Sequence, residues 1–274
     1  MLEIPGEEAP TDPGLILRQK KEQEEKLLQA ARQRKGRIQG AGVLPVPLVR
    51  NTDFSLDADA VLRAVTPAVK LVFLCSPNNP TGGLLERAAV LQVVRALAGR
   101  AVVVVDEAYV DFADQPSLAS EIPAHPNLVI LRTLSKAFGL AGARVGTTIA
   151  DPAIIAVLQK VIAPYPVPVP VLLAALGALS DEGLAAAQQS VATLLSERAR
   201  LAAALPQLPA VKQVWPSDTN YLLVEVADSA KAMNLARGTG VIWRDRSKDV
   251  PNTIRITVGT VAENNETLEV MGRV

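Results

Sequence analysis

Three stretches of the sequence decide the fold: LVFLCSPNNPTGG at residues 71–83, AVVVVDEAY at residues 101–109, and LVILRTLSK at residues 128–136. Each begins with a short apolar run and continues into polar residues. Short apolar runs separated by helical stretches are typical of buried parallel strands. Ligands of open α/β sheets bind outside the carboxyl ends of such strands. We therefore expect an amide, a carboxylate and an amine to converge in one crevice.

The composition is that of a folded protein. Hydrophobic residues make up 49% of the 274 residues and charged residues 20%, which allows a sizeable core. Lys plus Arg and Asp plus Glu are equal at 28 each, so charge gives no case for a nucleic acid or a membrane as partner. Cys75 and His125 are the only residues of their types. A disulfide framework and a Cys or His metal site are therefore excluded, and we expect no metal.

Location follows from two further features. The first ten residues are acidic and carry proline, unlike a secretory signal. No stretch reaches the about 18 uninterrupted apolar residues of a membrane span. We expect a soluble, cytoplasmic protein.

The pattern along the chain predicts an α/β fold, with a mostly parallel sheet flanked by helices and a smaller C-terminal α+β domain. We expect a charged, helical or mobile segment over residues 1–40, a large domain over 41–205 and a small domain over 206–274. The expected strands are 43–48, 71–76, 101–105, 128–131, 144–150, 211–215, 221–226 and 254–258. The expected helices are 15–37, 57–65, 84–98, one opened by Asp151-Pro152, two over 171–205, then 229–237 and 263–271. The helix over 15–37 is either a solvated helix or an association helix.

Lys136 and Asp106 are the first candidates for chemistry. Lys136 follows a strand, where a desolvated amine can form a Schiff base or bind phosphate; the alternative is a solvated surface lysine. Asp106 ends a run of four valines. It either caps the neighbouring turn or holds a proton on a heterocyclic nitrogen such as a pyridinium.

For four further residues the sequence allows two alternatives, a structural role or a functional one. Tyr109 either packs in the core or turns toward the crevice. Asn79 lies in a turn-forming stretch, and the following proline holds it extended. Arg144 forms a surface ion pair or grips a phosphate. Arg255, inside an apolar strand, faces solvent or anchors an anionic substrate.

The motifs together resemble a known family. Residues 76–82 (SPNNPTG), 106–109 (DEAY) and 132–146 (RTLSKAFGLAGARVG) occur in the order and spacing of the pyridoxal-phosphate aminotransferases of the aspartate aminotransferase fold. Within that family the chain looks most like the histidinol-phosphate aminotransferases. Further matching stretches are 160–166, 219–221, 244–245 and 255–260, so the likeness runs from about residue 42 to the end.

The resemblance implies a role for each candidate. Lys136 would bond to pyridoxal 5'-phosphate and shuttle a proton, and Asp106 would pair with the ring nitrogen. Asn79 and Tyr109 would hydrogen-bond the ring oxygen, and Ser135 and Arg144 would hold the phosphate. Arg255, helped by Arg244, would bind the acidic end of the substrate. The implied reaction moves an amino group between histidinol phosphate and 2-oxoglutarate in histidine biosynthesis, in a homodimer.

The sequence also departs from the family. The resemblance implies a preceding stretch with a substrate-covering arm, a phosphate-gripping turn and an aromatic residue that stacks on the cofactor ring, and none is found here. Two strands of the large sheet should be absent, one of them next to strand 71–76, which leaves an unprotected edge. Two alternatives to an active transaminase therefore stay open: an impaired, shortened paralogue that acts through association, and an amino-acid phosphate decarboxylase of the same fold.

Overall fold

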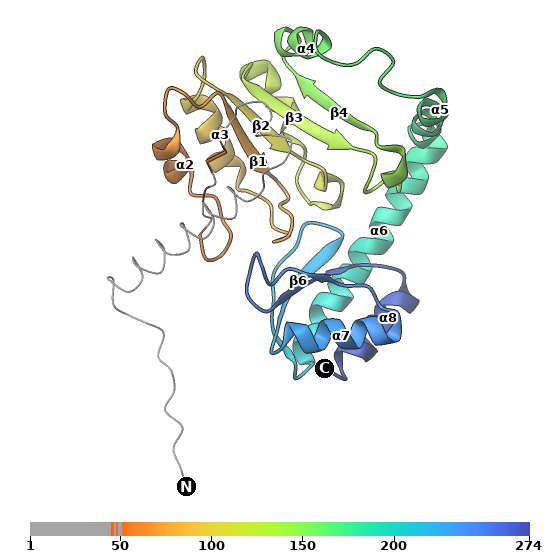
Figure 1. Cartoon of the computed structure of the whole chain (residues 1–274). Coiled ribbons are helices and arrows are strands. Elements are labelled where there is room, and N and C mark those ends of the chain that lie inside the picture. Colours follow the sequence, from red (N-terminus) through yellow and green to blue (C-terminus); the bar gives the residue numbers. More distant parts are fainter. Residues whose placement is uncertain (1–44, 47, 49–50) are drawn as a thin grey trace, which may run out of the picture.

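The computed structural model describes residues 45, 46, 48 and 51–274, which form two four-stranded sheets linked by a long helix (Figure 1). The helix expected over 15–37 lies outside the described residues. Of the strand expected over 43–48, residues 45, 46 and 48 are described, and none of the three is in a strand. The predicted α/β class with a mostly parallel first sheet is confirmed.

The first sheet has the order β1-β2-β3-β4. Its strands are β1 (Leu71–Cys75), β2 (Val102–Asp106), β3 (Leu128–Thr133) and β4 (Gly146–Ala150). The first three are parallel and β4 is antiparallel to β3. The expected strand over 144–150 begins two residues late because Arg144 has a left-handed backbone with φ of 57°.

One face of this sheet is covered by two helices, α2 (Ala58–Ala64) and α3 (Arg87–Ala96). Asp57 caps α2 because its carboxylate accepts a 2.8 Å hydrogen bond from the Ala60 amide. Alternate strand residues face these helices and form the first core with them. They include Val72, Leu74, Val103, Val105, Leu128 and Ile130.

The opposite face of β1 is open. Leu71 and Phe73 are 55% and 64% exposed, whereas Val72 and Leu74 between and after them are buried. Among the described strands β1 has a neighbour on one side only. Within the part of the chain that the structure describes, β1 is therefore an edge strand, as expected for residues 71–76.

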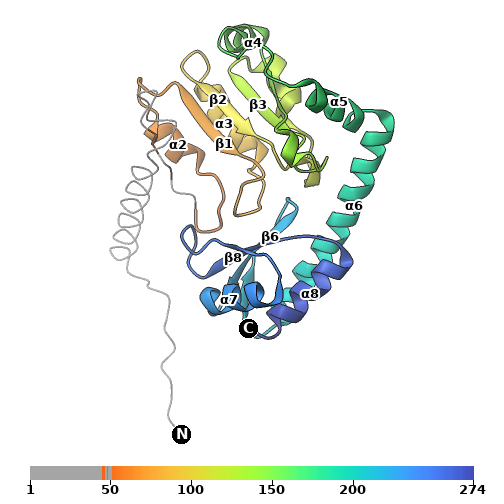
Figure 2. The same cartoon turned by 45° about the vertical axis from the view of Figure 1, so that its right-hand side comes forward.

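Three helices lead from the first sheet to the second: α4 (Pro152–Gln159), α5 (Val169–Ala178) and α6 (Asp181–Ala204), as Figure 2 shows. Asp151 caps α4 and Pro152 occupies its first turn, as predicted. Within residues 51–274 no single helix has the length and apolarity of a membrane span. Helix α5 and the helical residues 181–207 have them only when taken together, and this pair is bent by 68°.

The second sheet is antiparallel, with the order β5-β6-β8-β7. Its elements are β5 (Val211–Val214), β6 (Tyr221–Val226), α7 (Ser229–Thr239), β7 (Arg244–Asp245), β8 (Thr253–Thr257) and α8 (Val261–Met271). Leu201 and Leu205, at the end of α6, pack into the core of this sheet. The short strand β7 was not expected from the sequence, and the predicted domain limits stay a prediction.

Candidate active site

Three loops leave the first sheet at one edge. Cys75, Asp106 and Leu131 are aligned across β1, β2 and β3, which run parallel. Because the carboxyl ends of parallel strands meet at one edge, the segments that carry Asn79, Tyr109 and Lys136 leave the sheet together. This edge faces the second sheet, whose strands β6 and β8 lie below it (Figure 2).

Lys136 and Tyr109 are in contact at this edge. The Lys136 Nζ lies 5.1 Å from the centroid of the Tyr109 ring, within the range of a cation–π interaction. Tyr109 is buried and packs with Phe112 and Tyr221, while Lys136 is half-buried. The amine is thus held on an aromatic surface and still has access to a ligand.

Asn79 and Arg255 join the two sheets. Arg255 donates from Nη1 to Asn79 Oδ1 at 2.9 Å, and its guanidinium carbon lies 4.8 Å above the Tyr221 ring. Its Nε is buried and has no hydrogen-bond partner among the described residues. Arg255 as a whole is half-buried, and a guanidinium with an unpaired N–H has capacity left for an anion. Its contacts with Asn79 and Tyr221 therefore hold it at the site.

Tyr221 is a residue of this site that sequence reasoning did not single out. Its hydroxyl donates to the Asn78 carbonyl at 2.8 Å, and its ring meets the Tyr109 ring edge to face with centroids 5.3 Å apart. Burial raises the pKa of the Tyr221 hydroxyl, so it stays protonated and a donor. The sequence offered two signals, its place in the family-like stretch 219–221 and at the start of an apolar strand, and neither distinguishes a site residue from core packing.

Asp106 has the capping contact that its position suggested. Its Oδ1 accepts a 3.0 Å hydrogen bond from the Ala108 amide, and the side chain is half-buried. A carboxylate has about four acceptor positions, so this cap leaves room for a further donor. The geometry is compatible with both interpretations of Asp106.

Ser135, Arg144 and Arg244 lie at the margins of the cluster. Thr133 Oγ1 lies 2.9 Å from Ser135 Oγ and 3.1 Å from the Val145 carbonyl oxygen, within hydrogen-bond distance of both, which ties the strand end to the segment before β4. Arg144 is exposed and donates to the Ala141 carbonyl at 2.9 Å rather than to a carboxylate. Arg244 is exposed and lies opposite Arg255 in the ladder of β7 and β8.

A row of hydrogen bonds fastens the loop after β1 to the segment before β6. The Asp218 amide donates to the Gly82 carbonyl at 2.8 Å, and the Leu84 amide donates to Asp218 Oδ2 at 3.0 Å. Arg198 of α6 donates from Nη1 to the carbonyls of Phe112 and Thr219 at 3.2 and 2.7 Å. The contacts of Asn79 with Arg255 and Asn78 with Tyr221 therefore lie on a fixed seam between the sheets.

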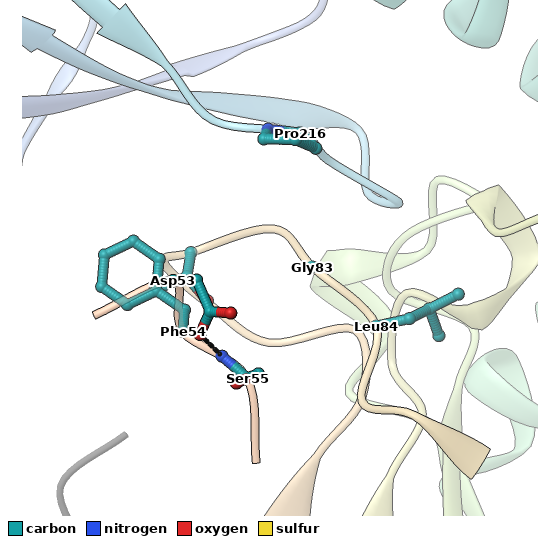
Figure 3. A pocket seen from close by; sticks show the side chains of 7 residues that line it. Asp53, Phe54, Ser55, Gly83, Leu84 and Pro216 are labelled. Carbon is teal, nitrogen blue, oxygen red and sulfur yellow. Dashed lines mark hydrogen bonds between the residues drawn. The ribbon is translucent and has the colours of Figure 1, made fainter. Parts of the chain in front are cut away.

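Two pockets adjoin the site without containing Lys136. The first, of about 150 Å³, lies on the seam (Figure 3) and is lined by Asp53, Phe54, Ser55, Thr81, Gly83, Leu84 and Pro216. The second, of about 280 Å³, is largely apolar. It lies between the β3–β4 end of the sheet and α5, and Phe138, Gly146 and Ala175 are among its lining residues.

The sequence and the fold both match known proteins. The family model described as "Aminotransferase class I and II" matches residues 33–271. The histidinol-phosphate aminotransferase of Stenotrophomonas maltophilia is 47% identical over 236 residues, covering 85% of this chain and 65% of that protein. Histidinol-phosphate aminotransferase 1 of Pasteurella multocida is 45% identical over 237 residues, covering 86% and 67%.

Solved structures show the same fold. The histidinol-phosphate aminotransferase of Sinorhizobium meliloti, solved in complex with pyridoxal-5'-phosphate, has a TM-score of 0.72 at 26% identity, covering 83% of this chain and 63% of that one. The enzyme of the same name from Clostridium acetobutylicum has a TM-score of 0.76 at 21% identity, covering 83% and 71%, a likeness of fold alone.

These matches define the class of protein. The chain belongs to the aminotransferase class I and II family. Within that family it is similar to histidinol-phosphate aminotransferases, and it spans about two thirds of the length of the relatives that it matches.

Proposed function

We propose that this chain is a pyridoxal-phosphate-dependent transaminase that moves the amino group of histidinol phosphate to 2-oxoglutarate, forming imidazole acetol phosphate and glutamate. The observation that carries the proposal is the Lys136 amine on the Tyr109 ring, beside the Asn79–Arg255 pair, at the carboxyl ends of parallel strands. The identity of 47% to a histidinol-phosphate aminotransferase supports the choice of substrate.

The residues at this edge fit the cofactor chemically. Asn79 Oδ1 is occupied by Arg255, so the amide group left for a ligand is its NH₂, the kind of donor that a ring oxygen needs. Asp106 keeps free acceptor capacity beyond the Ala108 cap, which suits a protonated ring nitrogen. Ser135, together with the exposed Arg144, would hold the phosphate.

Pyridoxal phosphate supplies an electrophilic aldehyde and an electron sink when it is bound. Lys136 would hold the cofactor through its amine and, once the substrate amine has displaced it, would move the proton to and from the substrate carbon. Tyr109 and Asn79 would orient the ring through its oxygen, and Asp106 would keep the proton on its nitrogen.

Arg255 would bind the carboxylate of 2-oxoglutarate or glutamate. Its unpaired, buried Nε and its planar donor fork suit a carboxylate. Arg244 lies opposite in the ladder and is the candidate for a second contact with an anionic substrate. Histidinol phosphate itself offers a phosphate as its anionic end, so this region has to accept both groups in turn.

The proposal includes a cytoplasmic, homodimeric enzyme. The relatives of 44–47% identity carry the name histidinol-phosphate aminotransferase, which supports a role in histidine biosynthesis.

The test begins with attachment of the cofactor. Purified chain is mixed with pyridoxal phosphate, reduced with borohydride and digested, and the modified peptide is located by mass spectrometry. We expect the label on Lys136 and its loss in Lys136→Ala, with Lys212→Ala on β5 as the matched control. A label spread over surface lysines and unchanged in Lys136→Ala contradicts the proposal.

Substrate and reaction are tested on the loaded protein. Glutamate should accumulate only when histidinol phosphate and 2-oxoglutarate are both present. Release of carbon dioxide from an amino-acid phosphate without 2-oxoglutarate would instead indicate the decarboxylase alternative. A labelled Lys136 without any turnover would indicate the impaired paralogue.

A further inference from the structure

Tyr221 occupies the centre of the contacts that hold the proposed site together. Three groups meet its side chain, which projects from β6: the Asn78 carbonyl at its hydroxyl, the Tyr109 ring at 5.3 Å and the Arg255 guanidinium at 4.8 Å. It is 1% exposed. No ligand therefore reaches its hydroxyl directly, and any effect of Tyr221 on chemistry passes through its neighbours.

The ring of Tyr221 sets the position of the Arg255 guanidinium. Arg255 lies on β8, opposite Leu223 of β6, and its guanidinium is over the Tyr221 ring. A position over an aromatic face stabilises a guanidinium without using any of its N–H groups. The fork of Arg255 thus stays available for Asn79 and for an anion.

The hydroxyl of Tyr221 sets the position of Asn79. It donates to the carbonyl of Asn78, and Asn79 is the next residue along the chain. This bond spans 143 residues of sequence and connects β6 to the loop after β1. Both partners of the Arg255–Asn79 hydrogen bond are thus placed by one side chain.

We infer that Tyr221 is a positioning residue that presents Arg255 to the carboxylate of the substrate, its ring supporting the guanidinium and its hydroxyl fixing the Asn79 loop. The inference rests on the proposed function for the identity of the substrate. The carboxylate site itself is a property of this chain, so it can be tested without turnover.

The experiment measures binding of succinate, an unreactive dicarboxylate, to the full chain by titration calorimetry. Tyr221→Phe keeps the ring and removes the hydroxyl, and we expect about fivefold weaker binding. Tyr221→Leu removes both, and we expect binding at least about tenfold weaker. Leu222→Val, on the same strand but in the core of the second sheet, is the matched control for lost stability.

The outcomes separate a positioning role from a structural one. The inference holds if Tyr221→Phe binds succinate more weakly than the unsubstituted chain and Tyr221→Leu binds it more weakly still. Leu222→Val should bind succinate within about twofold of the unsubstituted chain. It is overturned if both Tyr221 variants bind succinate normally, if Leu222→Val weakens binding equally, or if the unsubstituted chain does not bind succinate. The borohydride label on Lys136 is read separately, so failure of the transaminase proposal is distinguishable from failure of this one.

Discussion

Arg255 and Asn79 are 176 positions apart in the sequence and share a 2.9 Å hydrogen bond between Nη1 and Oδ1. This bond joins β8 of the second sheet to the loop after β1 of the first. It also leaves the Arg255 Nε buried without a partner among the described residues. The proposed anion site therefore depends on the two sheets keeping their relative position.

The first prediction concerns the planar fork of Arg255. Arg255→Lys keeps the positive charge but loses bidentate donation and stacking, so we expect KM for 2-oxoglutarate to rise about tenfold or more. Arg244→Lys is the comparison, since Arg244 is exposed on the neighbouring strand β7 and is proposed only for a second contact, so KM should rise less. Steady-state kinetics on both variants decide the point. An equal rise in KM for the two would mean that Arg244 has the same role.

The second prediction concerns Gly82 on the seam. Gly82 has φ of +85°, and a Cβ there would lie 2.8 Å from Ser217 Oγ. Gly82→Ala should lower the free energy of unfolding by about 1–3 kcal/mol. Gly83→Ala is the control because a Cβ at that position meets nothing within 4 Å. Urea unfolding of both variants measures the difference, and equal stability would contradict a tight seam at residue 82.

Much of the first sheet was predictable from local sequence. Runs such as the valines of residues 102–105 favour a buried strand wherever they occur, and Asp151-Pro152 begins a helix through its own capping chemistry. The parallel arrangement of β1, β2 and β3 follows because long connections, the first of them containing α3, separate these strands. These features depend on residues that are close together in the sequence, which is why they could be predicted from it.

Features that depend on distant contacts were not predictable. The two-residue strand β7 exists only because residues 244 and 245 pair with β8. The role of Tyr221 depends on Asn78 and Arg255, which no periodicity connects to it. The apolar helix α5 shows the converse: its composition predicts burial, yet Leu173 and Leu176 are exposed at 63% and 57%.

The third prediction concerns the open face of β1. Phe73 is 64% exposed at an edge strand, a position that favours intermolecular pairing. Phe73→Lys should reduce concentration-dependent association, measured by light scattering, while the free energy of unfolding changes by about 0.5 kcal/mol or less. Leu74→Ala, on the buried face of the same strand, should instead cost about 2–5 kcal/mol. If Phe73→Lys associates as strongly as the unsubstituted chain, the open face of β1 is not the surface through which copies associate.

The fourth prediction concerns the Glu197 carboxylate, which links α6 to α8. Arg200 donates to it at 2.7 and 3.0 Å, and Asn264 Nδ2 donates at 2.8 Å. These hydrogen bonds, with that from Arg200 the largest cause, hold the pKa of Glu197 below its ordinary 4.5. Because the pKa is lowered in the folded state, the stabilisation is present above 4.5 and is lost as the pH falls through the folded-state value.

Glu197→Gln should therefore unfold at a lower urea concentration than the unsubstituted chain at neutral pH, and the difference should shrink as the pH is lowered below 4.5. Glu266→Gln, an exposed position on α8, is the control and should show no such trend. Urea midpoints across this pH range give the measurement. A difference that stays constant with pH would mean that Glu197 stabilises the helix pair through packing and not through its charge.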